Sequence, residues 1–126
     1  FMRCSPDHHN IAVFNGPASF PHHTSWQVDD VDEIGRGAEE LLTGHDERKG
    51  WGFGRHYAGS NFFWYLKDPA GTFSEYYADM DQITEDDLWT PEVCEGKSGM
   101  YAWGPQLTEG FMPPSDVAEL IAAQNN

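Results

Sequence analysis

Cationic side chains are scarce in this sequence. Its 126 residues include 7 Lys and Arg against 21 Asp and Glu, for a formal net charge of −14 at pH 7. Nucleic acids and anionic membrane surfaces attract positive charge, so this balance argues against both as partners. The sequence also contains no apolar run near the length of a membrane span and no basic segment leading into an apolar one. We therefore expect neither a nucleic-acid-binding nor a membrane protein.

Cysteine is almost as rare. Cys4 and Cys94 are too few for a disulfide framework, so we expect two reduced thiols and a cytoplasmic location. Aromatic residues, by contrast, make up 14% of the chain, far more than a disordered segment carries. A length of 126 residues suits one domain. The composition thus predicts a single acidic globular domain, residues 1–126, and does not indicate a function.

The hydrophobic pattern predicts an α+β fold. Asp30 and Glu33 form a capping box before an apolar stripe of helical spacing, and Gly44 supplies a stop, so we expect a helix over 30–42. Short runs rich in aromatic and β-branched residues predict strands on both sides of it, at residues 10–14, 23–28, 51–56, 60–67 and 72–78. Residues 81–126 lack periodicity, and we expect an irregular tail there with a helix over 115–124, capped by Ser115.

Histidines cluster beside the predicted strands. Most of the six histidines lie there, as the pairs His8-His9 and His22-His23 and the single His56. A lone histidine in a strand is more often structural than a ligand. Their number and placement nevertheless make a metal site worth testing against the other residues on the same strands.

Two strands carry polar residues where an apolar core is not expected. Alternation places His23 on one strand face with Ser25 and Gln27. On a later strand, Glu75 shares a face with aromatic residues, and a carboxylate in such surroundings needs a partner. A metal ion bound by an imidazole and a carboxylate would satisfy both side chains.

Other motifs do not reach the pattern that their chemistry needs. Cys4 with His8 and His9 resembles part of a zinc site, but no second cysteine pair follows. The glycine-rich run 50–54 lacks the spacing of a phosphate-binding loop, and the acidic residues 79–87 lack the glycine and terminal glutamate of a calcium loop.

Three segments together resemble a known family. They are HHTSWQV at 22–28, GRH at 54–56 and FWYLKDPAGTFSE at 63–75, with the capped helix between the first two. This pattern is similar to the C-terminal part of the extradiol catechol dioxygenases, in the vicinal oxygen chelate superfamily. The resemblance implies a βαβββ module in a half-barrel mixed sheet with a flanking helix. Residues 15–80 would be the complete module, 1–14 the last strands of a preceding module, and 81–126 the tail.

The resemblance also implies roles for individual residues. His23 and Glu75 match two metal ligands, and His9 matches the acid–base histidine of the pocket. His56 and Tyr65 match a pair that hydrogen-bonds the substrate oxygen. The third ligand of the family is a histidine in the preceding module, so we expect a fragment of a longer enzyme or a contribution from another chain.

We interpret the remaining member of each histidine pair, His8 and His22, as structural. Strand alternation is expected to point each one away from its functional neighbour.

The implied chemistry suits these residue types. Two histidines and one carboxylate hold Fe(II) while leaving positions for a catechol and O₂, and Mn(II) accepts the same ligands. Moving protons on the diol requires a group that titrates near neutrality, which we expect of His9. The predicted activity is extradiol ring cleavage of a small aromatic diol with O₂, by a homo-oligomer or by a chain that needs its N-terminal part.

Two alternatives stay open. One is a glyoxalase-like lyase or isomerase of the same superfamily, which would not need His9, His56 and Tyr65 together. The other is a metal-free module that binds a small aromatic ligand. Stoichiometric metal in the isolated protein would favour an enzyme, whereas affinity for aromatic ligands without metal would favour the binding module.

Overall fold

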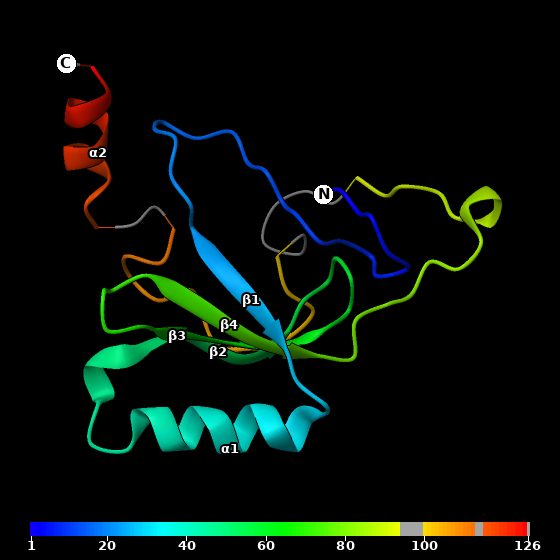
Figure 1. Cartoon of the computed structure of the whole chain (residues 1–126), viewed down its shortest axis with the longest axis horizontal. Coiled ribbons are helices and arrows are strands. Elements are labelled where there is room, and N and C mark those ends of the chain that lie inside the picture. The colour runs from blue at the N-terminus through cyan, green and yellow to red at the C-terminus, as the bar shows by residue number, and fades with distance from the viewer. Residues whose placement is uncertain (94–99, 113–114, 126) are drawn as a thin grey trace.

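A four-stranded mixed sheet lies at the centre of the computed structural model, and one helix covers one of its faces (Figure 1). The structure describes residues 1–93, 100–112 and 115–125, so Cys94 lies outside the described residues. The elements are β1 (His23–Gln27), α1 (Val31–Leu42), β2 (Lys49–Arg55), β3 (Phe62–Lys67), β4 (Phe73–Ala78) and α2 (Val117–Gln124), with short 3₁₀ turns at Asp46–Arg48 and Asp86–Leu88.

The strand order brings the two ends of the module together. The order across the sheet is β1-β4-β3-β2, with β1 parallel to β4 and the other two pairs antiparallel. In this register Glu75 of β4 lies between Ser25 of β1 and Tyr65 of β3. The predicted α+β fold, with its βαβββ order, mixed sheet and flanking helix, is confirmed.

Helix α1 begins and packs as its sequence pattern predicts. The Asp30 side chain accepts a hydrogen bond from the Glu33 backbone N–H at 2.8 Å, and the Glu33 carboxylate accepts one from the Asp29 N–H at 2.7 Å. These bonds satisfy backbone donors that the first helical turn leaves unpaired. Ile34 and Ala38 are fully buried on the side of the helix that faces the sheet.

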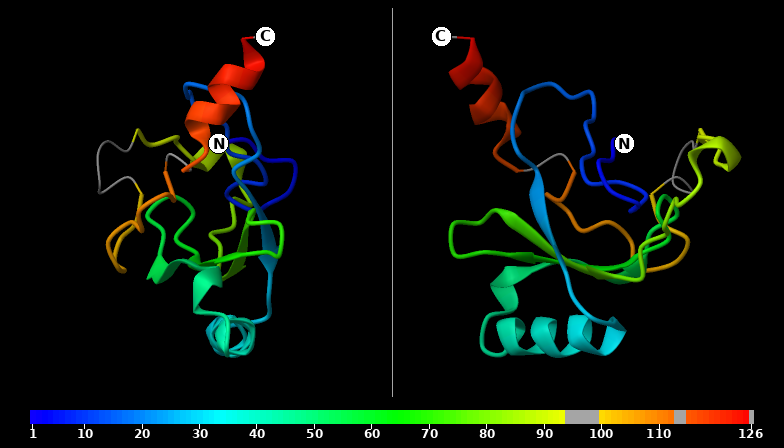
Figure 2. Two further views of the ribbon diagram at one scale, coloured as in Figure 1. Left: turned by 90° about the vertical axis from the view of Figure 1, so that its left-hand side faces the viewer. Right: turned by 45° about the vertical axis from the view of Figure 1, so that its right-hand side comes forward.

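An aromatic core covers the opposite face of the sheet. Its buried members are Trp51, Phe63, Tyr65, Phe73 and, from the tail, Phe111. Figure 2 shows α1 on one side of the sheet, with the N-terminal segment and α2 on the other.

Hydrogen bonds attach the tail to β2 at several points, including backbone bonds between Arg55 and residues 102–103. The Trp51 indole N–H donates to the Pro105 carbonyl at 2.9 Å, and the Thr108 hydroxyl donates to the Gly50 carbonyl at 2.7 Å. The irregular tail therefore closes the core and is part of the packed domain.

Two predicted elements differ in the structure. Residues 10–14 do not form a strand: Ile11 makes one isolated bridge to Met2, and its side chain is 56% exposed. An apolar run becomes a strand only where a neighbouring backbone pairs with it along its length. The C-terminal helix begins at Val117 instead of 115, because the Asp116 carbonyl accepts the first helical bond, from Leu120 N–H at 3.1 Å.

Within the described part of the chain, no helix is both long and apolar enough to cross a membrane.

Candidate metal centre

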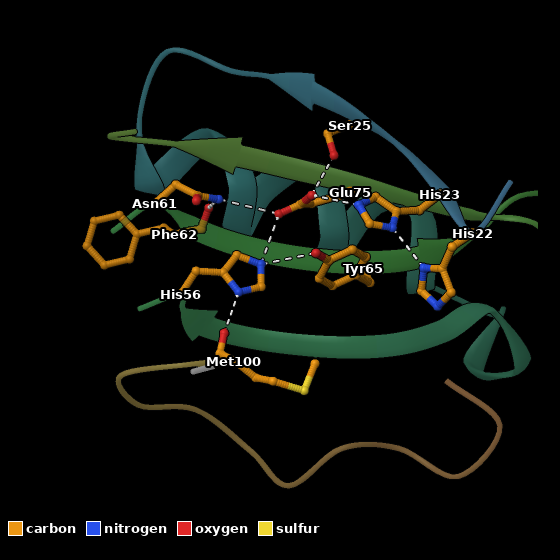
Figure 3. A network of polar contacts seen from close by, with 9 residues as sticks. All are labelled: His22, His23, Ser25, His56, Asn61, Phe62, Tyr65, Glu75 and Met100. Carbon is orange, nitrogen blue, oxygen red and sulfur yellow. Dashed lines mark hydrogen bonds and ion pairs between the residues drawn. The ribbon is translucent and has the colours of Figure 1, made fainter. Parts of the chain in front are cut away.

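Strands β1 and β4 place His23 and Glu75 side by side (Figure 3). His23 Nε2 lies 3.6 Å from Glu75 Oε2. Two donor atoms bound at right angles to one metal, each about 2.1 Å away, lie about 3 Å apart. The two atoms would have to approach by about 0.6 Å for both side chains to bind one ion.

Three side chains fix the Glu75 carboxylate, which is 5% exposed. The Ser25 hydroxyl donates to Oε2 at 2.5 Å, and the Asn61 amide donates to Oε1 at 3.4 Å. His56 Nε2 also lies 3.4 Å from Oε1. Burial opposes ionisation, but the hydrogen bonds and charges of His56, Ser25 and His23 outweigh it and hold the pKa of Glu75 below its ordinary value. The site thus contains a carboxylate anion.

His56 and Tyr65 form a hydrogen-bonded pair beside this carboxylate. The Met100 carbonyl lies 2.8 Å from His56 Nδ1, and because a carbonyl only accepts, that nitrogen carries the proton when the ring is neutral. In that neutral form His56 Nε2 accepts from the Tyr65 hydroxyl at 3.0 Å, whereas His56 lowers the pKa of Glu75 only as the protonated ring, whose Nε2–H points to the carboxylate. Burial, reinforced by the charge of Glu75, raises the pKa of Tyr65 well above its ordinary value, so the phenol keeps its proton.

His9 lies near enough for the charges of Glu75 and His56 to act on it. Burial, with a smaller contribution from neighbouring His8, lowers the pKa of His9 to about 4. The prediction that His9 titrates near neutrality is therefore wrong for this structure, because a buried imidazole loses the hydration that stabilises its charged form. At pH 7 the ring is neutral and can accept a proton.

The expectation that His8 and His22 point away from their neighbours is also wrong. His8 Nδ1 lies 3.0 Å from His9 Nδ1, and His22 Nδ1 lies 2.8 Å from His23 Nδ1. Strand β1 starts at His23, so the alternation rule does not extend back to His22. The pair His8-His9 lies outside every strand of the sheet.

Sequence reasoning also missed Asn61. This side chain is 1% exposed, lies just before β3, and reaches Glu75 of β4 across the fold. Its Oδ1 has no hydrogen-bond partner among the described residues. No local sequence signal marks it. The sequence pattern did indicate Ser25, because it shares a polar strand face with His23.

The donors fit a metal such as Fe(II) or Mn(II) in kind. Imidazole nitrogen and carboxylate oxygen suit both ions. Among residues 1–93, 100–112 and 115–125, no group of three or more His, Cys, Asp or Glu side chains is arranged to hold a metal. His23 and Glu75 therefore offer two protein donors, and a further ligand is needed to complete the site.

Comparison with known proteins identifies the family. Metapyrocatechase 2 of Cupriavidus necator is 41% identical over 107 residues, which cover 84% of this chain and 33% of the relative. This chain is homologous to part of the extradiol catechol dioxygenases. A second member, the manganese-dependent 2,3-dihydroxybiphenyl 1,2-dioxygenase of Geobacillus genomosp. 3, is 32% identical over an alignment that covers 94% of this chain and 39% of the relative. The chain thus spans about a third of the length of these dioxygenases. No family model matches the sequence.

Solved structures share the fold of this chain. The Mn(II)-bound glyoxalase from Novosphingobium aromaticivorans matches 93% of this chain and 42% of its own, with 30% identity and a TM-score of 0.72. Homoprotocatechuate 2,3-dioxygenase from Brevibacterium fuscum matches 73% of this chain and 30% of its own, with 19% identity and a TM-score of 0.63, which shows the fold alone.

Proposed function

We propose that this chain is part of an enzyme that opens the ring of a small aromatic diol with O₂, at an Fe(II) site or alternatively a Mn(II) site. One observation carries the proposal. The His23 and Glu75 donor atoms lie 3.6 Å apart, and the pair His56 and Tyr65 reaches the same carboxylate. Two side chains of the kind that bind metals and a hydrogen-bonded pair thus meet at one carboxylate, an arrangement that would suit oxidative cleavage of a diol.

His23 Nε2 and the Glu75 carboxylate would hold the metal, with a histidine from a preceding segment as the third ligand. The bound metal would supply the positive charge that holds the diol and brings it together with O₂. Glu75 contributes a fixed negative charge, because the Ser25 hydroxyl and the Asn61 amide donate to it and keep it oriented.

The other three residues act on the diol itself. A diol oxygen beside Glu75 would meet His56 Nε2 and the Tyr65 hydroxyl, which are already held in place by the Met100 carbonyl and the aromatic core. Prearranged hydrogen bonds of this kind orient a substrate without reorganisation during the reaction. The neutral ring of His9 would accept a proton from the diol.

A glyoxalase-like reaction is the second candidate, because a Mn(II)-bound glyoxalase is 30% identical and matches nearly the whole chain. Such a reaction consumes no O₂. Oxygen uptake with catechol, measured against turnover of a glutathione hemithioacetal, distinguishes the two activities.

Three substitutions test the assigned roles. His23→Ala and Glu75→Ala should each abolish stoichiometric iron, measured by inductively coupled plasma mass spectrometry, and with it diol cleavage. His9→Gln should keep the iron and slow turnover by about 10²–10⁴-fold, as loss of a proton-transfer group does. His45→Gln, on the exposed surface, should match the wild type. Iron retained in Glu75→Ala, or lost in His9→Gln, would overturn the assignment.

A further inference from the structure

His22 links the tail to the candidate ligand His23. On one side, His22 Nε2 lies 2.7 Å from the backbone carbonyl oxygen of Phe111, a tail residue 89 positions away. On the other side, His22 Nδ1 lies 2.8 Å from His23 Nδ1 (Figure 3). Both ring nitrogens of His22 are therefore used, one toward the tail and one toward the metal site.

The order of these contacts dictates where the protons lie. A carbonyl oxygen only accepts, so His22 Nε2 must donate to Phe111. A neutral imidazole has one N–H, which leaves a lone pair on His22 Nδ1. The short contact between the two Nδ1 atoms is then a hydrogen bond that His23 donates. His23 consequently carries its proton on Nδ1 and presents a lone pair on Nε2, the atom that lies toward Glu75.

Glu75 favours a proton on the other ring nitrogen of His23, Nε2. Its Oε2 lies 3.6 Å from His23 Nε2, and an anionic oxygen at that distance attracts a proton to the nitrogen. A proton on Nε2 would block metal binding, because a histidine ligand binds through a lone pair. The hydrogen bond to His22 competes with this attraction.

Packing holds the His22 ring in position. It stacks on Phe73 with centroids 5.5 Å apart, and it meets Phe111 edge to face at 4.9 Å. The ring is thus fixed by the same tail residue whose carbonyl orients its nitrogen.

We propose that His22 is a positioning residue that fixes the Nδ1–H tautomer of His23 and so keeps the Nε2 lone pair available to a metal. The chain of bonds runs from the Phe111 carbonyl through His22 to His23. The importance of this chain of bonds for metal binding rests on the proposed function, whereas the tautomer of His23 does not depend on that function.

The tautomers can be observed directly in metal-free protein labelled with ¹⁵N-histidine. Long-range ¹H–¹⁵N spectra at about pH 8.5, where histidine side chains are neutral, distinguish the two ring nitrogens. We expect the proton of His23 on Nδ1 and that of His22 on Nε2. A proton on Nε2 of His23 in the wild-type protein would overturn the proposal.

Two variants separate the hydrogen bonds from the packing. His22→Phe keeps an aromatic ring but removes both nitrogens, so His23 should shift toward the Nε2–H tautomer. Affinity for Mn(II), measured by calorimetry, should fall by about 10–100-fold, as for other partners of metal-binding histidines. His22→Asn keeps an acceptor near the position of Nδ1 and should restore the His23 tautomer and part of the affinity. His8→Phe, in the other histidine pair, is the matched control and should change neither the His23 tautomer nor the affinity for Mn(II).

The outcomes distinguish this proposal from the proposed function. An unchanged His23 tautomer in His22→Phe would overturn the role of His22, even if Glu75→Ala loses its metal. The expected tautomers in a longer protein that includes the preceding segment but binds neither Fe(II) nor Mn(II) would support that role and count against the proposed function.

Discussion

Burial and hydrogen bonding together set the charges of the single residues in this site. It lowers the pKa of His9 to about 4, whereas the hydrogen bonds around Glu75 outweigh burial and keep that carboxylate charged. An uncharged base and a charged acid therefore coexist at pH 7 in one buried site. This combination favours the binding of a cation and the transfer of a proton at the same place.

The low pKa of His9 predicts a dependence of stability on pH. Between its ordinary value of 6.5 and about 4, the unfolded chain takes up a proton that the folded protein does not, so stability is lost as the pH falls through this window. His9→Gln removes that contribution, and its free energy of unfolding should fall less between pH 7 and pH 4. Urea unfolding at several pH values measures the difference. An equal dependence in His9→Gln would contradict the burial argument.

The positions of site residues could be predicted from the sequence where the alternation within a single strand determines them. The polar face of β1 and the acid on β4 pointed to His23 and Glu75, which lie together in the structure. His22 was misjudged because its orientation depends on where the strand starts, a difference of one residue. Asn61 could not be predicted, since its contact with Glu75 joins the residue before β3 to the middle of β4 and depends on the tertiary fold.

At the scale of elements, local pattern also predicts helices better than strands, and the strand expected at residues 10–14 does not form. Helix α1 carries its start signal and its apolar stripe within its own sequence, so the pattern suffices to predict it. A strand also needs a partner, and Ile11 finds only a single bridge to Met2. The four strands that do form are those whose partners lie within the same module.

Replacement of glycine by alanine should have opposite effects on stability in β2 and in α1. A Cβ at Gly50 in β2 would lie 2.5 Å from the Tyr65 carbonyl oxygen, so Gly50→Ala must push β2 away from β3 and should cost about 1–3 kcal/mol. A Cβ at Gly35 in α1 meets nothing within 4 Å, and Gly35→Ala should stabilise the helix by about 1 kcal/mol. Thermal unfolding of both variants measures the difference. Equal effects would mean that β2 and β3 are less closely packed than described here.

At the scale of the whole molecule, the tail completes the aromatic core. Phe111 is 2% exposed and contacts Trp51, Tyr65 and Phe73. Phe111→Ala should therefore destabilise the protein by about 3–5 kcal/mol, as other buried phenylalanines do. Leu88→Ala, at a side chain 84% exposed, should change stability by less than about 0.5 kcal/mol. Chemical denaturation measures both, and a small loss for Phe111→Ala would show that the core is stable without the tail.

The position of β1 at the end of the strand order has a consequence for colloidal behaviour. One side of this strand pairs with no other strand in the part of the chain described, and Trp26, a residue of β1, is 60% exposed. Such edges promote association, while a net charge of −14 keeps copies apart by repulsion. Salt shortens the reach of that repulsion from about 10 Å at 0.1 M to about 3 Å at 1 M. Light scattering should thus show particles growing with ionic strength, and growing less in Trp26→Lys; scattering indifferent to salt would mean that the edge is not adhesive.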